Sequence, residues 1–166
     1  MRFDIRMFLE KELAPFAQDV SFDFSQRDFS GYRVAEPVTG RFSAEHVPAG
    51  VAMILALHAA ASSECARCLA PVSETYDFTR SYLVKESDLD DPDFELPLDE
   101  KGCLDLVELA YQEVIFEVPF VMLCSPDCLG LCPICGKRKA AGCSCQQADE
   151  AAPADARLGI LKQLLS

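Results

Sequence analysis

The amino-acid sequence predicts an α+β protein, in which an antiparallel β meander or small barrel is followed by a helix and a cysteine-rich C-terminal segment. Three observations predict this class. Apolar and polar residues alternate at the period of a β-strand through much of the first half of the chain. Apolar residues recur at helical spacing after residue 104. Six of the nine cysteines lie between Cys124 and Cys145.

The first half of the chain contains the expected strands. Alternation predicts strands with one buried face, and a more continuous apolar run predicts a more deeply buried strand. The alternating segments are 20–24, 32–34 and 76–82, and the apolar run is 51–57. Short connections rich in Gly, Pro and Ser favour antiparallel neighbours. Residues 6–14 are expected to form a short helix ahead of the strands.

An acidic segment separates these strands from the helical part. The chain has 166 residues and a net charge of −12, and residues 86–117 carry 12 acidic side chains against one basic side chain, Lys101. The part at about 86–100 is expected to be a solvated loop. It is either a solubilising connector or an acidic docking surface for a basic partner. The docking candidates are Asp88, Asp90, Asp91 and Asp93.

Two amphipathic helices are expected after this loop. The first has apolar side chains on one face from Leu104 to Val118, begins at the capping-box pair Asp105 and Glu108, and ends at Pro119. The second closes the chain, with Asp155 as its N-cap and Leu158, Leu161 and Leu165 on its apolar face. We therefore expect a core domain of residues 1–118 and a cysteine-rich, zinc-ribbon-like tail of residues 119–166 with a terminal helix.

The cysteines indicate metal binding. The N-terminal residues lack the apolar core of a secretory signal, and no apolar stretch approaches the roughly 20 residues of a membrane span. The expected location is therefore the cytoplasm, where cysteines form metal or redox sites rather than disulfides. Zinc prefers four soft ligands arranged as a tetrahedron. One expected set is Cys132, Cys135, Cys143 and Cys145, and a second is Cys65, Cys68, Cys124 and Cys128.

Other chemistry of the same sulfurs remains open. The spacing of Cys128, Cys132 and Cys135 matches a radical-SAM motif, which normally stands early in a much larger barrel. A thioredoxin-type CxxC would open a helix within a βαβ unit, and an iron–sulfur cluster also takes thiolate ligands. Cys103 lies outside both sets and is expected to be a small packing residue.

Catalytic motifs are scarce. There are two histidines, and the sequence contains no phosphate-binding loop, GxGxxG, GxSxG or HExxH pattern. The acidic balance also argues against a protein that coats nucleic acid with Lys and Arg. We therefore expect a protein without enzymatic activity.

The motifs together resemble the YceD family, also called DUF177. The resemblance rests on the CARCL sequence from Cys65, on the helix that opens at Asp105, and on the GLCPICG sequence from Gly130 with its flanking cysteines. The stretch Lys137-Arg138-Lys139-Ala140 departs from the family pattern, in which a loop with Asn and Leu is expected.

The resemblance implies a role in accumulation of large-subunit ribosomal RNA, and hence in ribosome assembly, with direct RNA contact in plastid relatives. Two interpretations reconcile that role with the acidic composition. A local basic face could bind ribosomal RNA or a pre-ribosomal particle, or the acidic segment could bind a basic ribosomal protein. The RNA-binding candidates are Arg67, Lys137, Arg138 and Lys139, with Arg80 as a further one. The alternative function is a thiol redox or metal-handling protein that uses a CxxC pair.

Overall fold

The computed structural model describes residues 1–11, 14–91, 93–139, 142–143 and 145, and it divides the chain into two units, Met1–Cys128 and Leu129–Ser166. This division lies later in the chain than the expected boundary after residue 118. The terminal helix expected from Asp155 lies outside the described residues. In the described part, no helix is long and apolar enough to cross a membrane.

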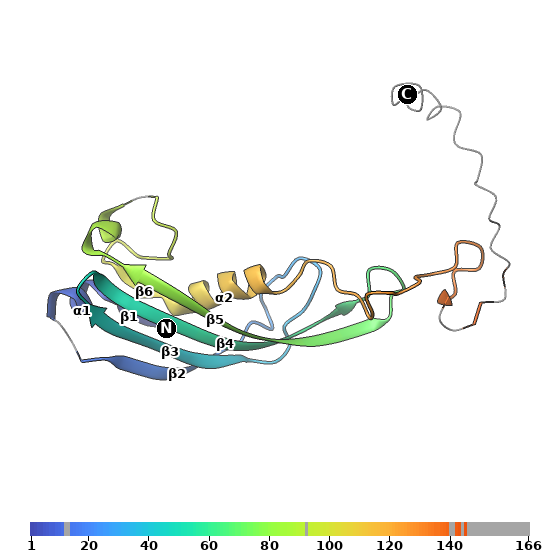
Figure 1. The fold of residues 1–166 in the computed structure, drawn as a ribbon, viewed down its shortest axis with the longest axis horizontal. Coiled ribbons are helices and arrows are strands. Elements are labelled where there is room, and N and C mark those ends of the chain that lie inside the picture. Colours follow the sequence, from blue (N-terminus) through green and yellow to red (C-terminus); the bar gives the residue numbers. More distant parts are fainter. Residues whose placement is uncertain (12–13, 92, 140–141, 144, 146–166) are drawn as a thin grey trace, which may run out of the picture. The chain divides into compact units, whose positions relative to one another are not determined.

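A four-stranded antiparallel sheet is the largest feature of the first unit (Figure 1). Its order is that of a simple meander, so the predicted α+β class and antiparallel meander are confirmed, in the form of an open sheet. The strands are β2 (Phe16–Phe22), β3 (Val38–Val47), β4 (Gly50–Glu64) and β5 (Pro71–Val84). The last two are the longest, and they extend together to a hairpin at residues 65–70.

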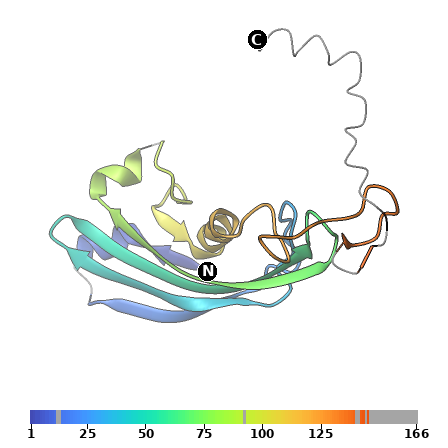
Figure 2. The same cartoon turned by 45° about the vertical axis from the view of Figure 1, so that its right-hand side comes forward.

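The central strand β4 shows why this sequence forms a sheet with one covered face. Its odd-numbered residues from Val51 to Ala61 are all buried, whereas the even-numbered ones between them are exposed or half-buried. Successive side chains of a strand point to opposite faces, so the alternation places one apolar face toward the core. Figure 2 shows α2 (Leu106–Glu117) lying over the concave side of the sheet.

Smaller elements complete the covered face. The strands β1 (Arg2–Asp4) and β6 (Cys103–Asp105) pair with each other in a two-stranded antiparallel sheet. Between them in sequence lie α1 (Ile5–Lys11), which corresponds to the predicted helix 6–14 and begins one residue earlier, and the 3-10 helix η1 (Glu86–Asp90). The acidic segment is therefore ordered in part by η1, whereas the sequence predicted a loop throughout.

The predicted start and end of α2 are confirmed. Asp105 is its N-cap, and its carboxylate accepts hydrogen bonds from the backbone N–H groups of Val107 (3.0 Å) and Glu108 (3.4 Å). The helix ends at Glu117, with Val118 as C-cap immediately before Pro119. Because proline cannot continue a helix without losing a hydrogen bond, this end is dictated locally.

The predicted strand that begins at Tyr32 is reduced to one antiparallel bridge. Arg33 and Ser62 of β4 exchange two backbone hydrogen bonds, of 2.8 Å and 2.9 Å, and residues 32–34 form no named strand of their own. Tyr32 and Val34 are buried, and the ring of Tyr32 stacks on that of Phe29. The predicted alternation of buried and exposed side chains is therefore present, but the pairing with β4 is only one residue long.

Candidate metal centres

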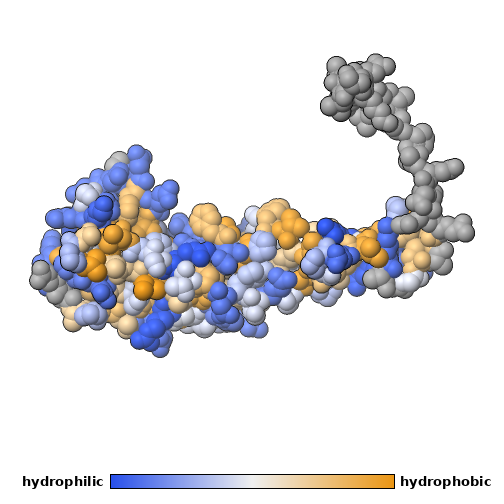
Figure 3. Space-filling model, viewed as in Figure 1, coloured by the Kyte–Doolittle hydropathy of each residue, from blue (hydrophilic) through white to orange (hydrophobic). Residues whose placement is uncertain are grey.

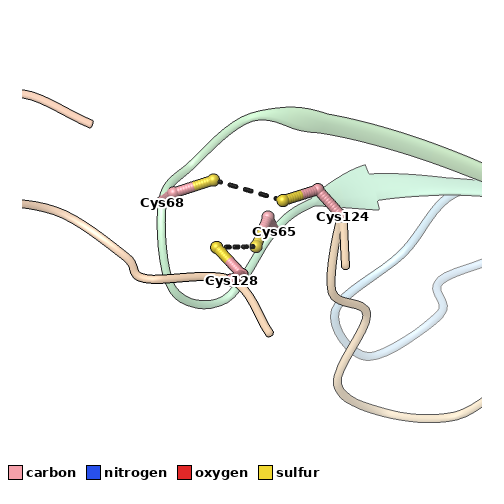
Figure 4. A group of neighbouring side chains, drawn as sticks. All are labelled: Cys65, Cys68, Cys124 and Cys128. Atoms are coloured by element: carbon pink, nitrogen blue, oxygen red, sulfur yellow. Dashed lines mark hydrogen bonds between the residues drawn. The ribbon is translucent and has the colours of Figure 1, made fainter. Parts of the chain in front are cut away.

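The first group of cysteines joins a hairpin to a segment far along the chain. Cys65 and Cys68 lie in the turn between β4 and β5, and Cys124 and Cys128 lie in the segment that follows α2. Their four sulfur atoms lie within 4.8 Å of one another (Figure 4). Cys65 and Cys68 are buried, whereas Cys124 is exposed and Cys128 half-buried. The group could therefore hold a metal ion near the surface of the first unit.

Two of the sulfur separations in the first group match those around one tetrahedrally bound ion. The Sγ atoms of Cys65 and Cys128 are 3.8 Å apart, and those of Cys68 and Cys124 are 3.6 Å apart. Four sulfurs at the usual zinc–sulfur distance from one ion stand about 3.8 Å from each other. These four sulfurs, which lie within a single unit, could therefore hold one such ion.

Hydrogen bonds to main-chain carbonyl groups hold the two halves of this group together. The N–H of Ala66 donates to the carbonyl of Met122 (3.1 Å), and the Met122 side chain is buried. The guanidinium of Arg67 donates to the carbonyls of Pro126 (3.0 Å) and Cys128 (3.2 Å). Arg67, a candidate for RNA binding, therefore braces the cysteine segment in this structure.

The second group lies within the second unit. Its sulfurs, from Cys132, Cys135, Cys143 and Cys145, also lie within 4.8 Å of one another. The Sγ atoms of Cys135 and Cys143 are 3.5 Å apart, and the Cys132 sulfur accepts a hydrogen bond from the N–H of Ile134 (3.4 Å). This group could hold a second metal ion.

The turns at Cys65 and Cys132 have the same backbone hydrogen bonds. Leu69 donates to the carbonyl of Cys65 and Gly136 to that of Cys132, both at 2.9 Å. One residue further on, the carbonyls of Ala70 and Lys137 accept from the two cysteine N–H groups, both at 2.7 Å. Two-residue cysteine spacing thus produces the same hydrogen-bonded turn at two places in the chain.

The residue after the second cysteine adopts a left-handed conformation in both turns. Gly136 has φ +70° and Leu69 has φ +57°. This region is open to glycine but costs roughly 1–2 kcal/mol for a residue with a Cβ atom. Leu69 was missed by sequence reasoning because the glycine that marks the position in the second turn is absent from the first.

Backbone N–H groups polarise one sulfur in each group. A hydrogen bond from the backbone of Cys124 lowers the pKa of Cys65 to about 6, and those from Cys135 and Ile134 lower that of Cys132 to about 6. The neighbouring sulfurs raise the pKa of Cys124 to about 12, and raise that of Cys145 likewise. Four thiols at these distances cannot all ionise on their own, whereas a bound cation would stabilise all four thiolates.

The radical-SAM spacing does not correspond to one site, because Cys128 belongs to the first group whereas Cys132 and Cys135 belong to the second.

The remaining predicted residues lie outside the two groups. Cys103 stands in β6, where burial raises the pKa of its thiol. Lys137, Arg138 and Lys139 follow the second turn, and the N–H of Lys139 donates to the carbonyl of Gly130.

The acidic docking candidates differ in what they contact. Asp88 accepts from the N–H of Lys85 (2.9 Å), and Asp90 forms an ion pair with Arg6 (3.0 Å). Asp91 and Asp93 are exposed and line a groove beside α2. Sequence reasoning also missed the role of Arg80, which binds Glu113 (2.9 Å) and Glu117 (2.7 Å) and so fastens α2 to the sheet.

Comparison with known proteins identifies the family. The model of the YceD family, described as large ribosomal RNA subunit accumulation protein YceD, matches residues 53–165. Uncharacterized proteins of Mycobacterium bovis and Mycobacterium tuberculosis are each 36% identical to the chain, in matches that cover 55% of this chain and 46% of the relative. The chain thus spans about half the length of these curated relatives, and no solved structure matches it. The chain belongs to the YceD family.

Proposed function

We propose that this member of the YceD family is a non-enzymatic cytoplasmic factor that promotes accumulation of large-subunit ribosomal RNA, and that two structural zinc ions order its cysteine turns. The family match over residues 53–165 is the observation that carries the proposal. The match includes both cysteine groups, and each group offers four sulfurs around a space for one ion. Zinc is the metal that four thiolates at tetrahedral spacing bind most commonly in structural sites.

We further propose that the protein reaches ribosomal RNA through a basic ribosomal protein. Two basic candidates in the first unit are engaged within the unit, since Arg67 binds backbone carbonyls and Arg80 binds Glu113 and Glu117. The candidates of the second unit are the three consecutive residues Lys137, Arg138 and Lys139, which is a small footprint for phosphate binding. The acidic segment, by contrast, offers many carboxylates to a basic partner.

A thiol redox function has weaker support. The lowered pKa values of Cys65 and Cys132 are a property of reactive thiols. However, the side chains of these two cysteines are buried, with 0% and 6% of their surface exposed, whereas a redox thiol must reach its substrate. Rapid alkylation of the native, metal-loaded protein would favour the redox function, and slow alkylation that accelerates with a chelator would favour structural zinc.

The test compares cells that lack the gene with cells complemented by variants. Wild-type protein should restore the level of large-subunit ribosomal RNA relative to small-subunit RNA. The variant Lys137→Ala/Arg138→Ala/Lys139→Ala should also restore it if a protein partner mediates the effect, whereas loss of complementation would favour direct RNA contact. Unchanged ribosomal RNA in cells that lack the gene would contradict the proposed role itself. Elemental analysis of purified protein should find two zinc ions per chain.

A further inference from the structure

A groove in the first unit lies between the acidic segment and α2. It has a volume of about 820 Å³ and is lined by residues of β5, of the acidic segment and of α2. Its apolar lining residues include Phe94, Leu96, Leu109 and Phe116. Leu109 is buried and forms part of the core, whereas Phe94 and Leu96 are half-buried. The groove therefore has an apolar lining that remains partly accessible to a ligand.

The ionisable side chains of the groove share one sign of charge. The acidic lining residues are Asp91, Asp93, Glu95 and Glu113, and none of the lining residues in the described part of the chain is Lys, Arg or His. Glu113 is already engaged with Arg80 and Tyr82. Among the described residues, no basic side chain forms an ion pair with Asp91, Asp93 or Glu95, and all three are exposed. These three carboxylates are thus available to cationic groups of a partner.

Exposed apolar side chains continue from the groove along the chain. Phe116 is 78% exposed, and just after the helix Phe120 and Val121 are 70% and 54% exposed. Figure 3 shows apolar surface over the C-terminal end of α2 and over the segment after it, while hydrophilic surface covers the acidic segment. Large aromatic side chains exposed together in this way are characteristic of binding surfaces rather than of ordinary solvated surface.

We propose that this groove binds a basic segment of a protein partner, with one large apolar side chain inserted beside Phe116 and with Lys or Arg side chains against Asp91, Asp93 and Glu95. Charge complementarity selects this occupant, because an RNA strand or a second acidic chain would meet like charges. The inference rests on the proposed function only for the identity of the partner, which would be a basic ribosomal protein. Asp88 and Asp90, two of the original docking candidates, lie outside the groove.

The test uses the full-length, metal-loaded protein and an array of overlapping peptides from the large-subunit ribosomal proteins. We expect bound peptides to be rich in Lys and Arg around a Leu, Ile, Phe or Met. For the strongest peptide, replacing that apolar residue by Ser, or Phe116→Ser in the protein, should weaken binding about tenfold, which corresponds to about 1.4 kcal/mol. The variant Asp91→Asn/Asp93→Asn/Glu95→Gln should weaken it similarly and reduce its salt dependence.

Matched variants separate the groove from general effects. Ile115→Ser changes an exposed apolar residue next to Phe116 that does not line the groove. Glu10→Gln/Glu36→Gln/Glu45→Gln removes three exposed charges elsewhere in the first unit. Both control proteins should bind like the wild type. Because Phe116 is so exposed, its replacement should not unfold the protein.

Several outcomes would overturn the inference. These are an array without binding, peptides whose binding depends on charge alone, or equal effects of the groove and control variants. Self-association that Phe116→Ser abolishes, without peptide binding, would instead identify the groove as an interface between copies of the chain. The proposed function is tested separately: ribosomal RNA that is unchanged in cells without the gene contradicts that function, yet leaves peptide binding by the groove intact.

Discussion

Loss of the first metal group should destabilise the first unit, because this group links two segments that lie far apart in the chain. The sulfur contact between Cys68 and Cys124 closes a loop of 56 residues, so the four ligands come together only when the unit is folded. An ion that binds the folded but not the unfolded chain stabilises the unit by about 4 kcal/mol when free metal is at about 1,000 times its Kd. The variant Cys124→Ser should therefore lower the free energy of unfolding of the first unit by about 4 kcal/mol, a large fraction of the usual stability of a domain.

Tyrosine fluorescence measures this effect selectively. The chain has no tryptophan, and all four of its tyrosines lie before residue 112, in the first unit. For a unit of this size, about 4 kcal/mol corresponds to a decrease in Tm of about 15 °C. A chelator should produce a similar decrease in the wild-type protein and little further change in Cys124→Ser.

The second group provides a matched control. Its contact between Cys135 and Cys143 closes a loop of 8 residues inside the second unit. Cys143→Ser should release one metal ion but leave the tyrosine-detected transition unchanged, and Cys103→Ser should preserve both metal ions. Equal decreases in Tm for Cys124→Ser and Cys143→Ser, or none with a chelator, would refute the assignment of the first group as a cross-link of the first unit.

Three further predictions concern single positions. Leu69→Gly should relieve the strain of the left-handed backbone conformation at this position and so tighten metal binding by the first group. Gly136→Ala, whose Cβ would meet no steric obstacle, should introduce that strain and weaken metal binding by the second group by about 1 kcal/mol. Chelator competition measures both changes in metal affinity. Gly40→Ala should cost about 1–3 kcal/mol in a urea titration, because its Cβ would lie 2.0 Å from the carbonyl oxygen of Ala56 on the neighbouring strand. Hydrogen bonds from the N–H groups of Cys103 and Lys101 hold the pKa of Asp99 below its ordinary value of 3.8. The stability that the Asp99 carboxylate contributes is therefore present above pH 3.8 and is lost as the pH falls through the lowered pKa of the folded protein. In acid titrations of the free energy of unfolding, Asp99→Asn should show a smaller decrease over this pH range than the wild type.

The parts of the fold that sequence predicts well depend on local signals. The helix α2 could be located because its N-cap Asp105 and the following Pro119 are adjacent to it in the chain. The second cysteine group is also local. By contrast, the segment at 32–34 has the alternation of a strand but pairs with β4 at Arg33 alone, since burial of Tyr32 and Val34 is enough to produce that pattern.

Features that depend on tertiary contacts were harder to predict. Spacing suggested that Cys65 and Cys124 belong together, but only the fold shows the hairpin beside the segment that follows α2. The groove joins side chains from three separate elements, so no sequence pattern could reveal it. The positive charge of Arg67 and Arg80 predicts RNA contact, whereas in the structure Arg67 binds carbonyl oxygens and Arg80 binds the carboxylates of α2.

The metal and the groove should prove separable, because α2 is held in place independently of the cysteines. Its N-terminus is capped by Asp105, and its C-terminal half is fixed to β5 by the contacts of Arg80 with Glu113 and Glu117. Phe116 lies between those two glutamates in sequence, so its position depends on these contacts. We therefore expect a chelator to lower the Tm of the first unit while most of the affinity for a groove-binding peptide remains at temperatures below the transition. Arg80→Met should have the opposite effect to the chelator: the protein should retain both metal ions but bind the peptide more weakly. If the chelator reduced peptide affinity as much as Phe116→Ser does, the metal would be required to position the groove, and the independence argued from Arg80 would be wrong.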